Sequence, residues 1–213
     1  MPARAPPLIH HGAQDRPLHY AVIDGERIRA HLPEVLALQQ QVNAVVDALH
    51  GEPLVPLDDA KVACNINITG PGGSYRWHYD RNAITAILYL NAVDGGATES
   101  YPNYRVRWPG GRDGTAQRWL DRVLQAAPVR ALSGLRHLVE PAAGKLLVMR
   151  GDRCLHSVRP VTGAADRINL VLSYDRPGAR YAMADGLNAY LYRPDKATTG
   201  SESGKPRDPN YTR

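Results

Sequence analysis

Two hydrophobic patterns divide the chain. Between residues 32 and 50, apolar side chains recur every three or four positions, which predicts an amphipathic helix packed on a larger body. From Lys61 to Thr69 the period changes to two, which predicts a half-buried strand. The helical stripe consists of Val35, Leu38, Val42, Val45 and Leu49.

Short segments with strand character follow, separated by turns rich in glycine, proline and aspartate. The sequence predicts a long loop at Tyr101–Gly114 and a helix at Thr115–Ala127. Many short strands with one helical insertion indicate a mainly β fold with supporting α-helices, and within that class a double-stranded β-helix (jelly-roll, cupin-like) core at about 61–175. The further strands are expected at Ser74–Asp80, Ala83–Asn91, Gly144–Arg150, Cys154–Val158 and Arg167–Asp175.

The length of 213 residues suits a single domain, 1–213, with a substantial core. Residues 1–18 are rich in proline, arginine and histidine and predict an irregular lead-in. The polar composition of residues 193–213 predicts a C-terminal tail outside the core.

The net charge of +5 and the pI near 9.3 come from arginines scattered along the chain. With no dense basic block, this pattern favours small anionic ligands in a basic cavity over nucleic acid. No apolar leader and no stretch long enough to span a membrane is present, so we expect a cytoplasmic protein with no membrane partner. Cys64 and Cys154 lie in apolar runs and are expected to be buried free thiols.

The residues that carry chemistry are His78, Asp80, His156 and Arg167. Alternate residues of a strand face the same side, so His78 and Asp80 are expected to point into one cavity. A histidine from a distant strand, His156, completes a set of two histidines and one carboxylate. That set occupies one face of a metal and leaves the opposite face open, as non-haem Fe(II) oxygenases require.

Arg167 follows His156 by eleven residues, on a strand whose polar face also carries Asn169. We expect the turn at Gly163–Asp166 to fold this strand back beside the one that bears His156. The guanidinium would then hold the far carboxylate of a 2-oxo acid that chelates the iron. The hydroxyl of Tyr89 is expected to add a hydrogen bond to that carboxylate.

With these residues in view, the sequence resembles the Fe(II)/2-oxoglutarate-dependent dioxygenases of the prolyl-hydroxylase-like superfamily. The similarity covers roughly Lys61 to Asp175, apart from the segment between Tyr101 and Val139. It rests on these runs: His78-Tyr79-Asp80, Thr85-Ala86-Ile87-Leu88-Tyr89-Leu90-Asn91, Gly95-Gly96, Gly144-Lys145-Leu146-Leu147-Val148, His156-Ser157-Val158 and Arg167-Ile168-Asn169.

The resemblance implies that His78, Asp80 and His156 are iron ligands, that Arg167 anchors 2-oxoglutarate, and that Tyr89 assists it. It implies Fe(II) as cofactor, 2-oxoglutarate and dioxygen as co-substrates, and ascorbate as a possible reductant. Related halogenases replace the acidic ligand with a small residue, so the presence of Asp80 favours hydroxylation or a related oxidation.

The expected reaction is the oxidation of an unactivated C–H bond of a small polar molecule, such as an amino acid or a natural-product intermediate. Two alternatives stay open: a prolyl or other peptidyl hydroxylase, and a non-catalytic cupin-like protein that binds a metal or a small acid. The sequence leaves the oligomeric state and the role of residues 101–138 open. Candidate substrate contacts are Asn65, Asn67, Tyr75, Arg81 and Arg105.

Overall fold

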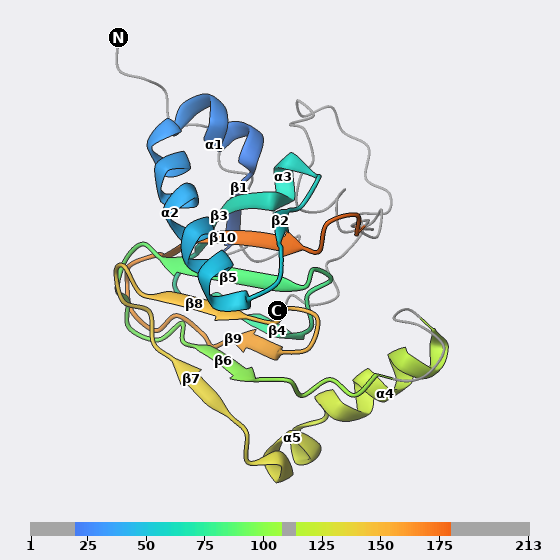
Figure 1. Cartoon of the computed structure of the whole chain (residues 1–213). Helices are drawn as coiled ribbons and strands as arrows, with labels where there is room; N and C mark the ends of the chain where they lie inside the picture. Colours follow the sequence, from blue (N-terminus) through green and yellow to red (C-terminus); the bar gives the residue numbers. More distant parts are fainter. Residues whose placement is uncertain (1–19, 108–113, 180–213) are drawn as a thin grey trace, which may run out of the picture.

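The computed structural model describes residues 20–107 and 114–179 (Figure 1). The predicted lead-in at 1–18 and the predicted tail at 193–213 lie outside these ranges. The elements, in chain order, are β1 (Tyr20–Ile23), α1 (Gly25–His31), α2 (Pro33–His50), β2 (Val55–Pro56), α3 (Ala60–Ala63), β3 (Cys64–Thr69), β4 (Tyr75–His78), β5 (Ile84–Tyr89), β6 (Thr98–Tyr101), α4 (Thr115–Gln125), α5 (Ala127–Ser133), β7 (His137–Val139), β8 (Leu146–Met149), β9 (Leu155–Val158) and β10 (Arg167–Asp175).

Two antiparallel sheets form the core, which confirms the mainly β fold. The larger sheet has the order β1-β3-β10-β5-β8, with β2 paired to β10, and the smaller one has the order β4-β9-β6-β7. Within the described residues the sheets do not close into a barrel, so the architecture is an open jelly-roll-like one. In the same ranges, no helix is long and apolar enough to cross a membrane.

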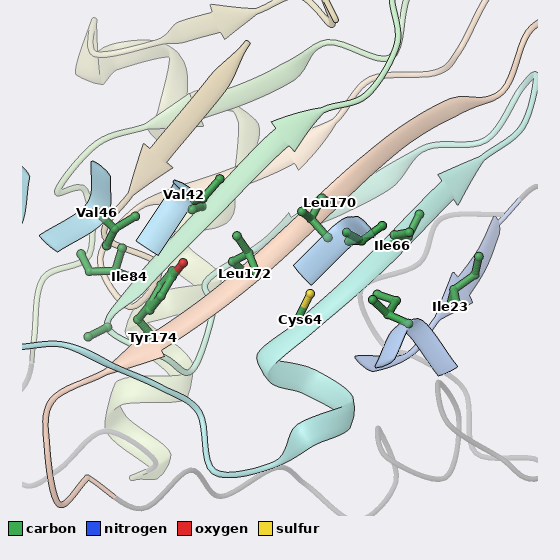
Figure 2. Packing of buried hydrophobic residues seen from close by; sticks show 13 residues of the cluster. Ile23, Val42, Val46, Cys64, Ile66, Ile84, Leu170, Leu172 and Tyr174 are labelled. Atoms are coloured by element: carbon green, nitrogen blue, oxygen red, sulfur yellow. The ribbon is translucent and has the colours of Figure 1, made fainter. Parts of the chain in front are cut away.

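Helices α1 and α2 cover one face of the larger sheet, where the main hydrophobic core lies (Figure 2). Side chains of β3, β5 and β10 at alternate positions, among them Ile66, Ile84 and Leu172, pack there against Val42 and Val46 of α2. The opposite alternate positions face the smaller sheet. We call this second surface the inner face, and it carries the candidate site.

Helix α2 begins and ends close to the predicted 32–50, but its buried stripe is shifted. Val35 and Val42 are buried as predicted, whereas Val45 is 43% and Leu49 68% exposed. Val46 is completely buried in place of Val45. Cys64 and Cys154 are buried free thiols, as expected.

The prediction of a strand from Lys61 is wrong for its first residues, which form the short helix α3. The side chain of Asp59 accepts a hydrogen bond from the Lys61 amide at 3.0 Å, and its carbonyl accepts one from the Ala63 amide at 2.9 Å. This N-cap favours a helical turn before the strand begins at Cys64.

The predicted helix at Thr115–Ala127 is two helices. Pro128 has no amide hydrogen to donate to the Leu124 carbonyl, so α4 ends at Gln125. The hydroxyl of Tyr104 donates to that carbonyl instead, at 3.1 Å. The predicted loop at Tyr101–Gly114 also begins one residue too early, because Tyr101 is the last residue of β6.

The expectation that β10 lies beside β9 is wrong. β10 pairs with β3 on one side and β5 on the other, in the larger sheet, whereas β9 lies between β4 and β6 in the smaller one. The chain therefore crosses from one sheet to the other between His156 and Arg167. His156 and Arg167 therefore belong to different sheets.

We expect Leu172→Ala to lower the free energy of unfolding by about 3 kcal/mol, because Leu172 is fully buried in the cluster between β10 and the helices. Urea denaturation of the metal-free protein measures this. Leu132→Ala is the matched control: Leu132 is 88% exposed, so its loss should change the unfolding free energy by about 0.5 kcal/mol or less. Equal effects of the two substitutions would contradict the placement of the core.

Candidate metal centre and active site

The antiparallel pairing of β4 with β9 sets His78 directly opposite His156. Opposite residues of neighbouring strands project to the same face, and the two imidazole ring centroids are 4.1 Å apart. The register of β4 shifts between Tyr75 and His78. Because of this irregularity Tyr75 also reaches the ring of His78, with centroids 4.9 Å apart.

Backbone carbonyls orient both imidazoles. Nδ1 of His78 lies 2.8 Å from the carbonyl oxygen of Arg76, and Nδ1 of His156 lies 3.0 Å from that of Cys154. A carbonyl only accepts, so each Nδ1 carries the proton and each Nε2 presents a lone pair. This tautomer is the one that binds a metal through Nε2.

Asp80 completes the cluster, but it lies beyond the end of β4. Its amide donates to the carbonyl of Gly151 at 2.9 Å. Its Oδ1 lies 3.5 Å from Nε2 of His78 and 3.6 Å from Nε2 of His156. The prediction that strand alternation places Asp80 is therefore wrong, although the carboxylate does reach both imidazoles.

Thr85 of β5 holds the second carboxylate oxygen of Asp80. Its hydroxyl donates to Oδ2 at 2.5 Å and accepts from Nδ2 of Asn82 at 2.9 Å. Burial by itself raises the pKa of Asp80, but His156, His78 and the Thr85 hydroxyl hold this pKa well below its usual range. The carboxyl group is therefore ionised.

Burial, reinforced by His78 and opposed by Asp80, lowers the pKa of His156 to about 4. The ring is neutral at physiological pH and can donate its Nε2 lone pair. His78, Asp80 and His156 each offer one ligand atom to the same point, with these atoms within 4.8 Å of one another. Two imidazoles and one ionised carboxylate fit an Fe(II) ion, with part of its coordination sphere left to other ligands.

Arg167 is buried on the inner face and has no carboxylate partner among the described residues. Only 3% of it is exposed, and its Nε makes no hydrogen bond. Burial lowers the pKa of Arg167, an effect that the neighbouring Tyr89 opposes. A guanidinium stays protonated even so, and an unpaired cation in this position fits an anionic ligand.

Thr98 of β6 links Arg167 to Tyr89. Its Oγ1 accepts from the Tyr89 hydroxyl at 2.6 Å and from Nη2 of Arg167 at 3.0 Å. With both lone pairs occupied, the Thr98 hydroxyl proton is left to donate. The guanidinium also lies over the Tyr89 ring, with the guanidinium carbon of Arg167 5.2 Å from the ring centroid. The predicted direct bond from Tyr89 to a carboxylate stays a prediction.

Gly96 makes room for this arrangement. Its φ is +65°, and a β-carbon at this position would lie 2.8 Å from Cδ of Arg167. Both the backbone conformation and the close approach require glycine. The second glycine of the Gly95-Gly96 turn before β6 is therefore explained by the Arg167 side chain that packs against it.

The inner face also carries uncharged polar side chains, beside a smaller apolar cluster that includes Ile87 and Val171. Asn169 lies opposite Tyr89 on one side and Asn67 on the other, and its Oδ1 is buried without a hydrogen-bond partner. Asn65 lies further along β3, opposite Val171, and its Nδ2 donates to the Val62 carbonyl at 3.3 Å. Asn65, Asn67 and Asn169, all predicted to contact ligands, therefore lie on the inner face.

The other candidate substrate contacts are placed differently. Tyr75 lies against His78, and Arg81 is exposed just after Asp80. Arg105 packs over the ring of Tyr79, with its guanidinium carbon 4.9 Å from the ring centroid, and forms an ion pair with Asp121. Its predicted contact with substrate stays a prediction.

Sequence reasoning missed Thr85, Thr98 and Gly151. A signal existed for Thr98, because it alternates with Ser100 in a short polar run after Gly95-Gly96. Thr85 shares the alternating face of β5 with Tyr89. Nothing local in the sequence marks Gly151, which meets Asp80 only in the folded chain.

Comparisons with known proteins agree with this geometry. A model of the 2OG-Fe(II) oxygenase superfamily matches residues 64–174, just over half of the chain. Among curated proteins, none matches significantly.

Several solved structures share the fold. The non-haem α-ketoglutarate-dependent epimerase SnoN from nogalamycin biosynthesis is 15% identical, with a TM-score of 0.59 over 96% of this chain and 79% of that one. HygX from Streptomyces hygroscopicus, with nickel and 2-oxoglutarate bound, is 14% identical, with a TM-score of 0.50 over 76% and 72%. A Trichoplax adhaerens prolyl hydroxylase, in complex with a hypoxia inducible factor peptide fragment, is 18% identical, with a TM-score of 0.50 over 73% of this chain.

The chain spans 62% of that prolyl hydroxylase, less than two thirds of its length. At these identities the structural likeness establishes the fold, and the family match establishes the class. The chain belongs to the 2OG-Fe(II) oxygenase superfamily and is a 2-oxoglutarate-dependent non-haem iron dioxygenase.

Proposed function

We propose that the protein hydroxylates an unactivated C–H bond of a small polar molecule in a reaction that consumes 2-oxoglutarate and dioxygen. The observation that carries the proposal is a complete metal-ligand set together with a buried cation that has no carboxylate partner within residues 20–107 and 114–179. His78, Asp80 and His156 converge on one point, and Arg167 lies in the same space between the sheets.

In this proposal Nε2 of His78, Nε2 of His156 and the Asp80 carboxylate hold Fe(II). The bound iron, with 2-oxoglutarate and dioxygen, supplies the oxidising power for C–H cleavage. The chain keeps the imidazole of His156 neutral, keeps Asp80 ionised, and fixes all three groups through backbone and hydroxyl contacts. Preorganisation of this kind maintains an open coordination face for the other reactants.

Arg167, Thr98 and Asn169 are proposed to hold 2-oxoglutarate. Thr98 lies opposite Val158, which is two residues along β9 from His156. Thr98 is therefore about 7 Å along the strand from the pair of His78 and His156. The cation that contacts Thr98 is therefore separated from the metal ligands by about the length of a five-carbon diacid. A carboxylate there would accept from Nε of Arg167 and from the Thr98 hydroxyl.

The substrate is proposed to be a neutral or weakly charged polar molecule. Asn65 and Asn67 offer amide hydrogen bonds from the inner face, and Tyr75 offers an aromatic ring beside His78. The arginines that follow β6 give little support to a carboxylate-bearing substrate. Arg105 and Arg107 form ion pairs with Asp121 and Asp152.

The first prediction concerns the cofactors. Anaerobic addition of Fe(II) and then 2-oxoglutarate to the metal-free protein should produce a weak charge-transfer band in the green. His78→Ala removes a ligand and should abolish the band, whereas Leu132→Ala, at an exposed position far from the ligands in sequence, should retain it. Metal binding without a band in the wild type would favour the cupin-like binding protein instead.

The second prediction separates the two halves of the site with two isosteric substitutions. Thr85→Val removes the hydroxyl that holds Asp80, so the dissociation constant for Fe(II) should rise about 10-fold with little change in the KM for 2-oxoglutarate. Thr98→Val removes the hydroxyl that contacts Arg167, so the KM for 2-oxoglutarate should rise about 10-fold with the affinity for Fe(II) retained.

Each threonine variant is the control for the other, since both residues are buried and neither substitution alters side-chain shape much. Titration calorimetry with Fe(II) and steady-state kinetics provide the two readouts. If both variants weaken both ligands equally, the proposed division between metal and co-substrate positions is wrong.

The third prediction concerns substrate class. Small polar molecules should stimulate succinate release by the wild-type protein, and Asn67→Ala should raise the KM of the stimulating molecule without altering the affinity for Fe(II). Stimulation by long peptides, and not by single amino acids or other small molecules, would establish the peptidyl-hydroxylase alternative and overturn the proposed substrate.

A further inference from the structure

The turn from Arg150 to Cys154, which connects β8 to β9, contacts two of the three metal ligands. The Gly151 carbonyl accepts the amide of Asp80 at 2.9 Å. The Cys154 carbonyl accepts Nδ1 of His156 at 3.0 Å. The position of this turn therefore sets both the carboxylate and one imidazole.

The contact between the turn and Asp80 leaves little free space. A β-carbon on Gly151 would lie 2.8 Å from Cβ of Asp80 and 2.7 Å from Oγ1 of Thr85. Both distances are shorter than van der Waals contact allows. A shift of the turn by a few tenths of an ångström is therefore transmitted directly to Asp80 and its hydroxyl partner.

A segment from outside the β core holds the turn in place. We call residues 104–107, which follow β6, the strap. The amide of Arg105 donates to the carbonyl of Arg153 at 3.1 Å. The guanidinium of Arg107 pairs with Asp152 at the tip of the turn, where the Arg107 side chain is 48% and the Asp152 side chain 6% exposed. A buried carboxylate needs such a partner, so this ion pair fixes the turn against the strap.

Helix α4 holds the strap through the side chains of Asp121 and Gln117. Nε and Nη2 of Arg105 donate to the two carboxylate oxygens of Asp121 at 3.0 and 2.5 Å. Nε2 of Gln117 donates to the Val106 carbonyl at 3.0 Å and to Asp121 Oδ1 at 2.9 Å. Gln117 is 2% exposed, whereas Trp119 on the same helix is 66% exposed. The buried contact of α4 is therefore polar and directed at the strap.

We propose that α4 and the strap position the iron ligands Asp80 and His156 through the turn, with Arg107 as the positioning residue. The inference rests on the proposed metal centre and gives a role to the insertion between β6 and β7. No residue of the strap or of α4 needs to touch the metal or the substrate.

The test is Arg107→Gln, which removes the ion pair between the strap and Asp152. The dissociation constant for Fe(II), measured anaerobically by titration calorimetry, should rise about 10-fold. Arg107→Lys retains the charge and should recover most of the affinity. Electrostatics alone predicts the opposite sign, because removing a positive charge near a cation site strengthens cation binding. Weaker binding therefore reports displacement of the ligands.

A second readout does not depend on metal. Amide hydrogen exchange in a peptide that contains Asp80 should accelerate in metal-free Arg107→Gln, because the Asp80 amide is bonded to the turn. Asp121→Asn, which weakens the hold of α4 on the strap, should accelerate the same exchange. This variant carries the test if Arg107→Gln does not fold.

The control is the double variant Arg136→Gln and Arg159→Gln. It removes the two arginines that form ion pairs with Glu99. Their side chains are 46% and 44% exposed, which is similar to the 48% of the Arg107 side chain. Glu99 lies between Thr98 and Ser100 on β6 and faces away from the metal ligands, so Fe(II) affinity should not change.

Two failures are distinguishable. If the wild-type protein binds no Fe(II), the proposed function fails, and the positioning role fails with it. If the wild type binds Fe(II) but neither Arg107→Gln nor Asp121→Asn alters its affinity or the exchange of the Asp80 amide, the positioning role alone is overturned.

Discussion

The pairing of β4 with β9 is the constraint on which the site depends. It sets His78 opposite His156, and two backbone carbonyls then fix both imidazoles with Nε2 directed at Asp80. A slip of one residue in this register would turn one histidine to the far face of the sheet. The histidine pair is therefore a property of strand pairing, and it exists only when the smaller sheet has formed.

The two faces of the larger sheet have separate tasks. The face toward α1 and α2 carries the hydrophobic core and accounts for much of the stability. The inner face carries amides, hydroxyls and Arg167, several of them buried and two atoms without a hydrogen-bond partner. Buried polar atoms of that kind oppose folding. The apolar contacts between the sheet and the helices on its other face offset this unfavourable free energy.

The sequence predicted what depends on local periodicity and on residue type. The helix at 32–50, most strands, the buried thiols and the identity of His78, Asp80 and His156 followed from spacing and from the resemblance. The structure confirms the helix, the mainly β class and the convergence of the three side chains on one point.

What the sequence missed depends on contacts between distant segments. β10 inserts between β3 and β5 because its alternating apolar residues, among them Leu170 and Leu172, fit the core against the helices, and no local pattern reveals this choice of sheet. The same holds for Gly151, whose carbonyl positions Asp80 from a turn far along the chain. Strand ends were also misplaced where a side chain caps a turn, as Asp59 does.

The two charged side chains at the centre of the site, Asp80 and Arg167, have different surroundings, and this difference indicates function. Asp80 receives a hydroxyl and lies between two imidazoles, so the folded chain prepares its negative charge for a cation. Arg167 receives one hydroxyl oxygen and one aromatic face but no carboxylate within the described residues. A charge pair built for stability would join the two directly. Here each charge is left to a separate ligand of opposite sign, which is the arrangement that a metal ion and an anionic co-substrate require.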